Sequence, residues 1–199
     1  MIKIAAFIEL NKTINKYILK QKYNVKKKFG DQIYLNHPVH LTLFTININK
    51  IKDLVKLYQS EIAPKKKNFL IKITEASIFE NDLVTNGSTL HYRVQKNKNL
   101  FKLQIDHLKY INKHISVLKT QKIKNINSIL KKNYLRYGFL FAGNIWQPHV
   151  TVASIRNINK KHKFIKRFLK TRINLKCTVN EIKFYKINEN KHKLIFSYK

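Results

Sequence analysis

The sequence predicts an α+β fold, because strand-like and helix-like segments alternate along it while two strand pairs are close enough in sequence to be antiparallel. These pairs are expected within 68–95 and 173–198. The 199 residues suffice for one substantial domain or two closely packed lobes. With 44% hydrophobic residues the chain can bury a core, which excludes disorder of the whole chain. We therefore expect an α+β protein with a mixed sheet or two sheets.

Hydrophobic periodicity and chain breakers set the elements of the first half. The spacing of Ile14 and Ile18 predicts a helix that Gly30 ends, and a second apolar helix face stops before Pro64. Asn86-Gly87 is a turn signal between two β-branched runs. The expected strands are 2–9, 39–48, 68–79 and 89–95, and the expected helices are 12–28 and 50–62.

The second half is predicted in the same way. Helical spacing is clear from Phe101 to Ile115, and Phe164 to Leu169 mark a later helix. The tail indicates a hairpin with Asn188-Glu189-Asn190 near its turn. The expected helices are 100–115, 125–136 and 160–170, and the expected strands are 147–154, 173–186 and 193–198.

The N-terminal apolar run and the single cysteine bear on the compartment. Glu9 breaks that run, which is too short for a secretory or membrane segment, and no later stretch approaches eighteen uncharged apolar residues. Cys177 cannot form an intrachain disulfide, and no cysteine cluster suggests zinc. We expect a cytoplasmic monomer without a membrane partner or a cofactor.

The formal net charge of +31 favours binding of polyanions such as RNA. A second reading is open, because 36 of the 41 basic residues are lysine and both Asn and Ile are abundant. An AT-rich genome produces this bias without selection for binding. Arginine, the better bidentate ligand of phosphate, occurs five times.

Two short motifs carry the chemistry that the sequence predicts. They are His40-Leu41-Thr42 and His149-Val150-Thr151, each with a proline close before it and each within a strand-like run. Residues i and i+2 of a strand share a face, so each motif presents an imidazole beside a hydroxyl. Two such pairs that face each other offer one base, one acid and two phosphate ligands, with no need of a metal.

Chance does not readily produce this pattern twice. Eight histidines and ten threonines in 199 residues give roughly 0.4 His-x-Thr triplets at random. The alternative is two unrelated half-buried histidines, with threonine present for its β-propensity.

The two motifs resemble those of a known family. Asn36 to Phe44 (NHPVHLTLF) and Trp146 to Ala153 (WQPHVTVA) are similar to the paired His-hydrophobic-Thr-hydrophobic motifs of the 2H phosphoesterase superfamily, which includes bacterial 2′-5′ RNA ligase and cyclic phosphodiesterases. The resemblance implies a single two-lobed α+β domain over 1–199, with pseudo-twofold symmetry and a central cleft. It further implies that His40 and His149 are acid and base, that Thr42 and Thr151 bind phosphate, and that the substrate is RNA or a nucleotide.

One position departs from the RNA-ligase branch, which often has a basic residue three positions after the second motif's threonine. This chain has Ser154 there, and Arg156 lies on the same face if the strand continues. The departure bears on membership of that branch, while the paired motifs carry the resemblance to the superfamily.

Other residues near the motifs have two readings each. Tyr34 and Trp146 can stack a nucleobase, although core or rim packing is the alternative for both. His37 is expected in a surface loop, and a metal site with His40 is disfavoured because the side chains diverge across Pro38 and no carboxylate is near. The remaining histidines are expected to be solvated: His91, His107, His114, His162 and His192. The lysine runs 26–28, 65–67 and 131–132 are expected to be solvated helix ends and loops.

The sequence thus predicts an enzyme that cleaves or forms phosphodiesters at a ribose 2′-oxygen. Candidate substrates are RNA 2′,3′-cyclic phosphate ends, 2′-5′ linkages and cyclic oligonucleotides. A basic RNA-binding module without catalysis and a nucleotide sensor are the alternatives.

Overall fold

The computed structural model describes residues 1–60, 63–64, 68–119, 126–188 and 191–199. Within these ranges strands and helices are interspersed along the chain, and some strands follow one another directly. The strands are β1 (Ile2–Glu9), β2 (His40–Ile48), β3 (Phe69–Phe79), β4 (Ser88–Val94), β5 (His149–Ile155), β6 (Arg172–Val179), β7 (Ile182–Asn188) and β8 (Lys191–Tyr198). The helices are α1 (Lys12–Phe29), α2 (Ile51–Gln59), α3 (Lys98–His114), α4 (Ser128–Tyr137), the short 3₁₀ turn η1 (Gly143–Ile145) and α5 (Lys163–Leu169).

The strands form one eight-stranded sheet in the order β6-β3-β4-β5-β2-β1-β7-β8. Every pairing between neighbouring strands is antiparallel. The α+β class is confirmed, whereas the expectation of a mixed sheet or two sheets is wrong. The alternation of strands and helices suggested parallel crossovers, but α1 connects two antiparallel neighbours, β1 and β2, and packs on β5 and β6 in the other half of the sheet.

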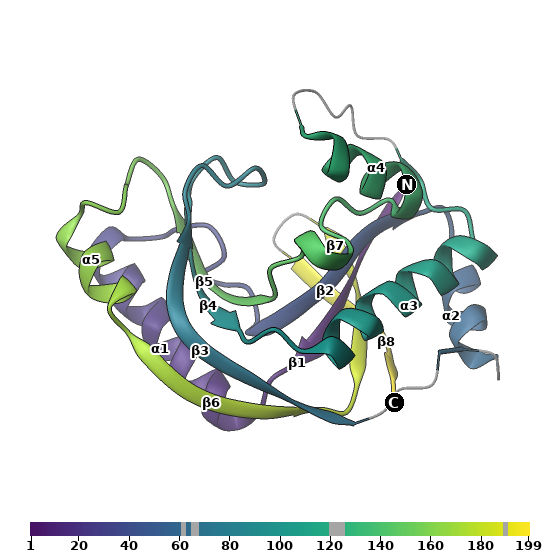
Figure 1. Ribbon diagram of the computed structural model, residues 1–199, viewed down its shortest axis with the longest axis horizontal. Coiled ribbons are helices and arrows are strands. Elements are labelled where there is room, and N and C mark those ends of the chain that lie inside the picture. The colour runs from purple at the N-terminus through teal and green to yellow at the C-terminus, as the bar shows by residue number, and fades with distance from the viewer. Residues whose placement is uncertain (61–62, 65–67, 120–125, 189–190) are drawn as a thin grey trace.

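The strand order divides the sheet into two halves of four strands. Each half is covered by its own helices (Figure 1). Helices α1 and α5 pack against β5, β6 and β3, while α3 packs against β2 and contacts α2, α4 and η1. Strands β2 and β5, which carry the two motifs, are the inner strands of the halves. The apolar side chains of the inner strands, including Leu41, Leu43, Val150 and Val152, are fully buried. This arrangement places one motif at the inner edge of each half.

Helix α1 forms where the periodicity predicts it. The Asn11 side chain caps it by accepting from the backbone N–H of Ile14 at 3.0 Å. Gly30 ends it with a φ of 68°, which glycine adopts without the strain that a Cβ would cause. Its buried stripe holds Ile14, Ile18 and Val25, but it also holds Lys22. A lysine in a buried stripe requires a local partner.

The expected hairpin over 173–186 and 193–198 is partly wrong. The segment 173–186 is two strands, because the chain breaks at Asn180-Glu181 and passes from β6, an edge strand, to β7 in the other half (Figure 1). Val179 and Ile182 are both fully buried, so the polar pair between them is the place where the chain can turn. β7 and β8 do form the C-terminal hairpin, although two residues of its predicted turn, 189–190, lie outside the described residues.

Two predicted helices are shorter than expected. α2 ends at Gln59, with residues 61–62 outside the described part, and α5 begins at Lys163 because the His162 side chain caps it. The turn at Asn86-Gly87 is confirmed, with Asn86 at a φ of 55°. The lysine run 65–67 falls outside the described residues, whereas the runs at 26–28 and 131–132 are exposed as expected. No helix in the described part of the chain is long and apolar enough to cross a membrane.

Candidate active site

The two motifs lie on adjacent strands and meet at their central residues. Leu41 of β2 pairs with Val150 of β5, and this is the one pair that joins the two strands. Both residues are fully buried, whereas the flanking residues of each motif are half-buried. Because strand residues alternate, the histidine and threonine of each motif leave the sheet on the face opposite to Leu41 and Val150. Extending the antiparallel register by one residue in each direction makes the two histidines diagonal neighbours. The Cα atoms of diagonal neighbours are about 7–8 Å apart in a regular ladder.

The two histidine rings are held by the same kind of hydrogen bond. His40 Nδ1 lies 2.7 Å from the carbonyl oxygen of Pro38, and His149 Nδ1 lies 2.7 Å from that of Gln147. A carbonyl can only accept, so each Nδ1 carries the proton. In the neutral ring this leaves Nε2 unprotonated. Both imidazoles are therefore set up to exchange a proton through Nε2.

Burial keeps both rings neutral in the free protein. The pKa of His40 is lowered to about 3, and burial is the largest cause. The Pro38 carbonyl opposes this shift, whereas His192, Lys22 and His37 contribute to it. Burial also lowers the pKa of His149, opposed by the Gln147 carbonyl and by Asp82. The charged groups around the two histidines therefore shift their pKa values in opposite directions. Lys22 and two imidazoles lower the pKa of His40, whereas the Asp82 carboxylate raises that of His149.

The ring of His40 rests on an aromatic cluster. Phe7 of β1 stacks on it, with ring centroids 3.6 Å apart and planes 19° from parallel. Tyr185 of β7 and His192 of β8 contact Phe7 in turn, at centroid distances of 5.2 and 5.7 Å. Stacking and the Nδ1 hydrogen bond together fix the ring plane.

The ring of His149 is held edge-on. His91 of β4 lies 5.0 Å from it and Phe79 of β3 lies 4.9 Å from it, both as T-shaped contacts. Phe79 and His91 stack on each other at 3.9 Å. The pKa of His91 is lowered to about 3, mainly by burial and next by the nearby His149. This ring is therefore neutral and acts by packing.

Three predicted binding residues lie at different depths. Tyr34 is half-buried and has a backbone φ of 72°. Burial, and next the negative charge of Asp82, raise the pKa of its hydroxyl to about 12. Trp146 is 5% exposed and packs on Phe101, which favours the core reading. β5 ends at Ile155, so Arg156 is an exposed turn residue and the continued strand that would have aligned it with Ser154 is not there.

Ser154 itself is fully buried and serves the fold. Its backbone N–H donates to the carbonyl of Ile33 at 2.9 Å, and its hydroxyl bonds that of Thr85 at 2.7 Å. These contacts tie the loop before β2, and the loop between β3 and β4, to the motif strand β5.

The expectation that five further histidines are solvated is wrong for two of them. His91 and His107 are 1% and 0% exposed, whereas His114 is exposed and His162 and His192 are half-buried. His107 lies on the buried stripe of α3 with Leu103 and Leu108 and bonds the Tyr58 hydroxyl at 2.6 Å. That stripe was visible in the sequence. The burial of His91 depends on Phe79, which no local pattern connects with it.

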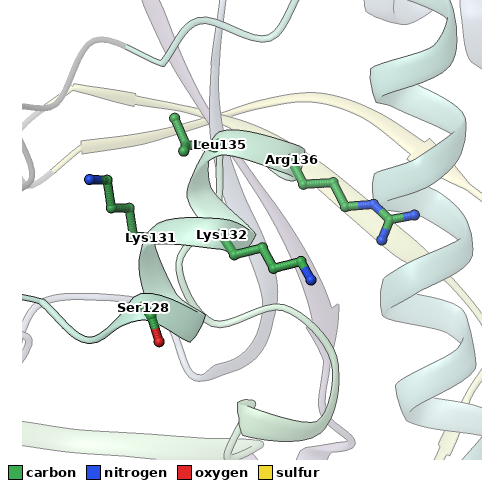
Figure 2. A pocket seen from close by; sticks show the side chains of 5 residues that line it. All are labelled: Ser128, Lys131, Lys132, Leu135 and Arg136. Carbon is green, nitrogen blue, oxygen red and sulfur yellow. The ribbon is translucent and has the colours of Figure 1, made fainter.

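Two surface hollows lie away from the motifs. Figure 2 shows the first, which lies on α4 between Lys131, Lys132 and Arg136, with Ser128 and Leu135 beside them. The second lies at the start of β1 and the end of β7. Neither is lined by a motif residue, so shape by itself does not mark the site, and the chemistry of the motifs does. The described residues contain no group of three or more His, Cys, Asp or Glu side chains arranged to hold a metal ion.

Comparison with solved structures gives matches over nearly the whole chain. TT0787 of Thermus thermophilus matches with a TM-score of 0.66 at 12% identity, over 98% of this chain and 96% of that one. Escherichia coli LigT in complex with 3′-AMP matches with a TM-score of 0.58 at 13% identity, over 99% and 97%. Kluyveromyces marxianus Usb1 matches with a TM-score of 0.53 at 12% identity, over 98% and 97%. No family model matches the sequence, and no curated protein sequence does.

The chain therefore has the fold of the LigT-like 2H phosphoesterases. The structural neighbours TT0787, LigT and Usb1 are members of that superfamily, so the resemblance that the motifs carry is matched by the fold. At 11–13% identity, the likeness is one of architecture.

Proposed function

We propose that this protein is a metal-independent phosphoesterase that acts on RNA or nucleotide phosphodiesters by acid–base catalysis with His40 and His149. The observation that carries the proposal is the pairing of Leu41 with Val150, which joins the two His-x-Thr motifs at their centres. Adjacent strands with alternating side chains then offer two imidazoles and two hydroxyls on one face, within reach of a single phosphate.

The hydrogen bonds at Nδ1 suit these rings to proton transfer. One histidine takes a proton at Nε2 from the attacking oxygen, a water in hydrolysis. The attacking oxygen bonds to phosphorus, the bond from phosphorus to the leaving ribose oxygen breaks, and the other histidine delivers its Nε2 proton to that oxygen. A 2′,3′-cyclic phosphate is opened in this way to a monophosphate. The two backbone carbonyls, of Pro38 and Gln147, hold both rings in the tautomer that this exchange needs.

The phosphate of the substrate supplies the negative charge that stabilises a protonated histidine in the site. Both rings are neutral in the free protein because burial lowers each pKa. An anionic phosphate between them favours a proton on one ring and raises its pKa toward the working range. The hydroxyls of Thr42 and Thr151 donate to nonbridging oxygens, where negative charge builds in the transition state.

The structural neighbours support a nucleotide substrate. LigT of E. coli has been crystallised with 3′-AMP, with ATP, with NADP⁺ and with phosphate. The net charge of +31 attracts RNA to the surface, whatever its origin. Together these favour a phosphate ester of a nucleotide, with 2′,3′-cyclic phosphate ends, 2′-5′ linkages and cyclic oligonucleotides as the candidate substrates.

The test is ring opening of a short RNA that ends in a 2′,3′-cyclic phosphate, in the presence of EDTA. Wild type, His149→Ala and His114→Ala are compared, since His114 is an exposed histidine remote from the motifs in sequence. We expect opening by wild type and by His114→Ala, and a loss of at least about 100-fold in His149→Ala. Equal activity of all three proteins would refute the site. Salt-sensitive RNA binding with no turnover on any candidate substrate would favour the basic binding module.

A further inference from the structure

Two more imidazoles gather beside His40, and the mechanism above does not use them. His37 belongs to the loop before β2, and His192 lies on β8, far away in the sequence. Their rings meet edge to face with centroids 4.5 Å apart, and the ring of His192 is 6.2 Å from that of His40. Tyr34 also contacts the ring of His37, with ring centroids 5.0 Å apart. The three histidines therefore form one cluster at the first motif.

A buried lysine holds the loop that carries His37. Lys22 of α1 is 4% exposed, and its Nζ donates to the carbonyl oxygens of Tyr34 at 2.6 Å, His37 at 2.7 Å and Leu35 at 3.4 Å. Burial lowers the pKa of Lys22 to about 8, which leaves it charged at neutral pH. These hydrogen bonds hold the loop in place without a ligand and set the charged Lys22 ammonium against its backbone.

The charges that act on the cluster are positive. Burial is the largest of the effects that lower the pKa of His192 to about 4, and His37 and Lys22 are the others. His192, Lys22 and His37 are also the charged groups that act on His40. Imidazoles crowded around a buried cation repel one another when protonated, and an anion placed among them would relieve that repulsion.

The Glu9 carboxylate is already engaged by two side chains of β7. Glu9 of β1 lies opposite His40 in the sheet, but it accepts from Lys183 Nζ at 2.8 Å and from the Tyr185 hydroxyl at 3.2 Å. Asp82 acts on Tyr34 and His149 and is not among the groups that shift the pKa of His40 or His192. The groups that act on His40 and His192 are thus Lys22 and the neighbouring imidazoles, while Glu9 is paired with Lys183 and Tyr185.

We infer that His192, with the ring of His37 packed against it, forms a second anion subsite beside His40, which binds the phosphate next to the reacting one in an oligonucleotide. The inference rests on the proposed function, since it takes the reacting phosphate to lie between His40 and His149. Imidazole N–H groups donate to phosphate oxygens. Nε2 of His37 is buried, whereas His192 is half-buried, so His192 is the donor to the phosphate and His37 packs against it. The substrate class becomes RNA ends or oligonucleotides, which carry a neighbouring phosphate, in preference to nucleoside 2′,3′-cyclic phosphates, which do not.

The experiment compares two uncleaved ligands by calorimetry at constant ionic strength: adenosine 3′-monophosphate and adenosine 3′,5′-bisphosphate. We expect the second phosphate to tighten binding to wild type by about tenfold or more. His192→Gln should lose most of this gain and keep the affinity for the monophosphate. The matched control is Lys193→Gln, which removes a full charge from the exposed neighbour of His192 on β8, on the alternate face of the strand. It should keep the gain.

A second readout separates binding by His192 from a structural role. An added phosphate raises the pKa of nearby imidazoles, so the bisphosphate should bind with more proton uptake in wild type than in His192→Gln, measured in two buffers of different ionisation enthalpy. A gain that is unchanged in His192→Gln, or lost equally in Lys193→Gln, would overturn the subsite. The proposed function fails separately, if His149→Ala opens a 2′,3′-cyclic phosphate as fast as wild type does, while a gain that still depends on His192 would leave the subsite standing.

Discussion

Phe7 and His91 occupy equivalent positions in the two halves of the sheet. Phe7 on β1 lies opposite Thr42, and His91 on β4 lies opposite Thr151. The strand register shifts directly before each of them, between Ala6 and Phe7 and between Leu90 and His91. Both rings then pack on the histidine of the neighbouring motif. A register shift that places an aromatic ring against the motif histidine is thus present twice, once in each half of the sheet.

This equivalence suggests His91→Phe as a substitution that the fold tolerates. In the folded protein the pKa of His91 is about 3, against 6.5 for a free imidazole, so the unfolded chain takes up a proton that folded His91 does not. Its contribution to stability is present above about pH 6.5 and is lost as the pH falls toward 3. Between about pH 7 and pH 5, wild type should lose about 2 kcal/mol more than His91→Phe in the free energy of unfolding. Urea unfolding at both pH values measures this, and an equal loss in the two proteins would show that His91 is not held neutral.

The tautomer of the motif histidines is a second prediction. Because the carbonyl groups of Pro38 and Gln147 accept from Nδ1, neutral His40 and His149 should both be protonated at Nδ1 and bare at Nε2. Nitrogen chemical shifts of the labelled protein at neutral pH distinguish the two tautomers, with exposed His114 as the internal reference. A proton on Nε2 of either motif ring would contradict the geometry.

Lys22 should be needed for stability. Lys22→Met keeps the length of the buried side chain but leaves the carbonyls of Tyr34, Leu35 and His37 without their common donor. We expect a loss of about 2–4 kcal/mol in the free energy of unfolding. Lys20→Met, at an exposed position of the same helix, should change it by less than about 0.5 kcal/mol. Equal losses from both substitutions would mean that the three bonds do not stabilise the loop.

The motif threonines should affect turnover more than stability. Thr42→Val and Thr151→Val keep the shape and β-propensity of the side chain and remove a hydroxyl that donates to the phosphate. Each should lower kcat/KM by about 10- to 100-fold. Thr178→Val, at an exposed position of the edge strand β6, is the control and should leave kcat/KM unchanged. Wild-type kcat/KM in both motif variants would remove the threonines from the proposed site.

Local pattern was enough to predict the motif strands. Alternation around Leu41 and Val150 set each histidine beside its threonine, and the structure has both strands where they were expected. That β2 and β5 are neighbours does not follow from local pattern, because strand order depends on long-range packing. The resemblance of the two motifs to a known family implied a central cleft between two lobes, and it did not predict this strand pairing.

The supporting rings could not be found in the sequence. Phe7 lies in an apolar run that looks like any buried strand, and its contact with His40 depends on a register shift. His192 reaches the first motif because β7 pairs with β1, and the sequence suggested a single long strand where β6 and β7 separate. Lys22 stands in a charged helix and resembles its solvated neighbours, so its burial becomes visible only when the loop before β2 is in place.

The most direct test of the account is the rate of 2′,3′-cyclic phosphate opening under single-turnover conditions in His40→Ala, His149→Ala and the double variant. Residues that transfer protons in one step act as a unit, so their effects are not additive. We predict that each single substitution lowers the rate by at least about 100-fold and that the double substitution lowers it little further. A rate near that of wild type in either single variant, or losses that simply multiply in the double variant, would contradict the joint action of His40 and His149.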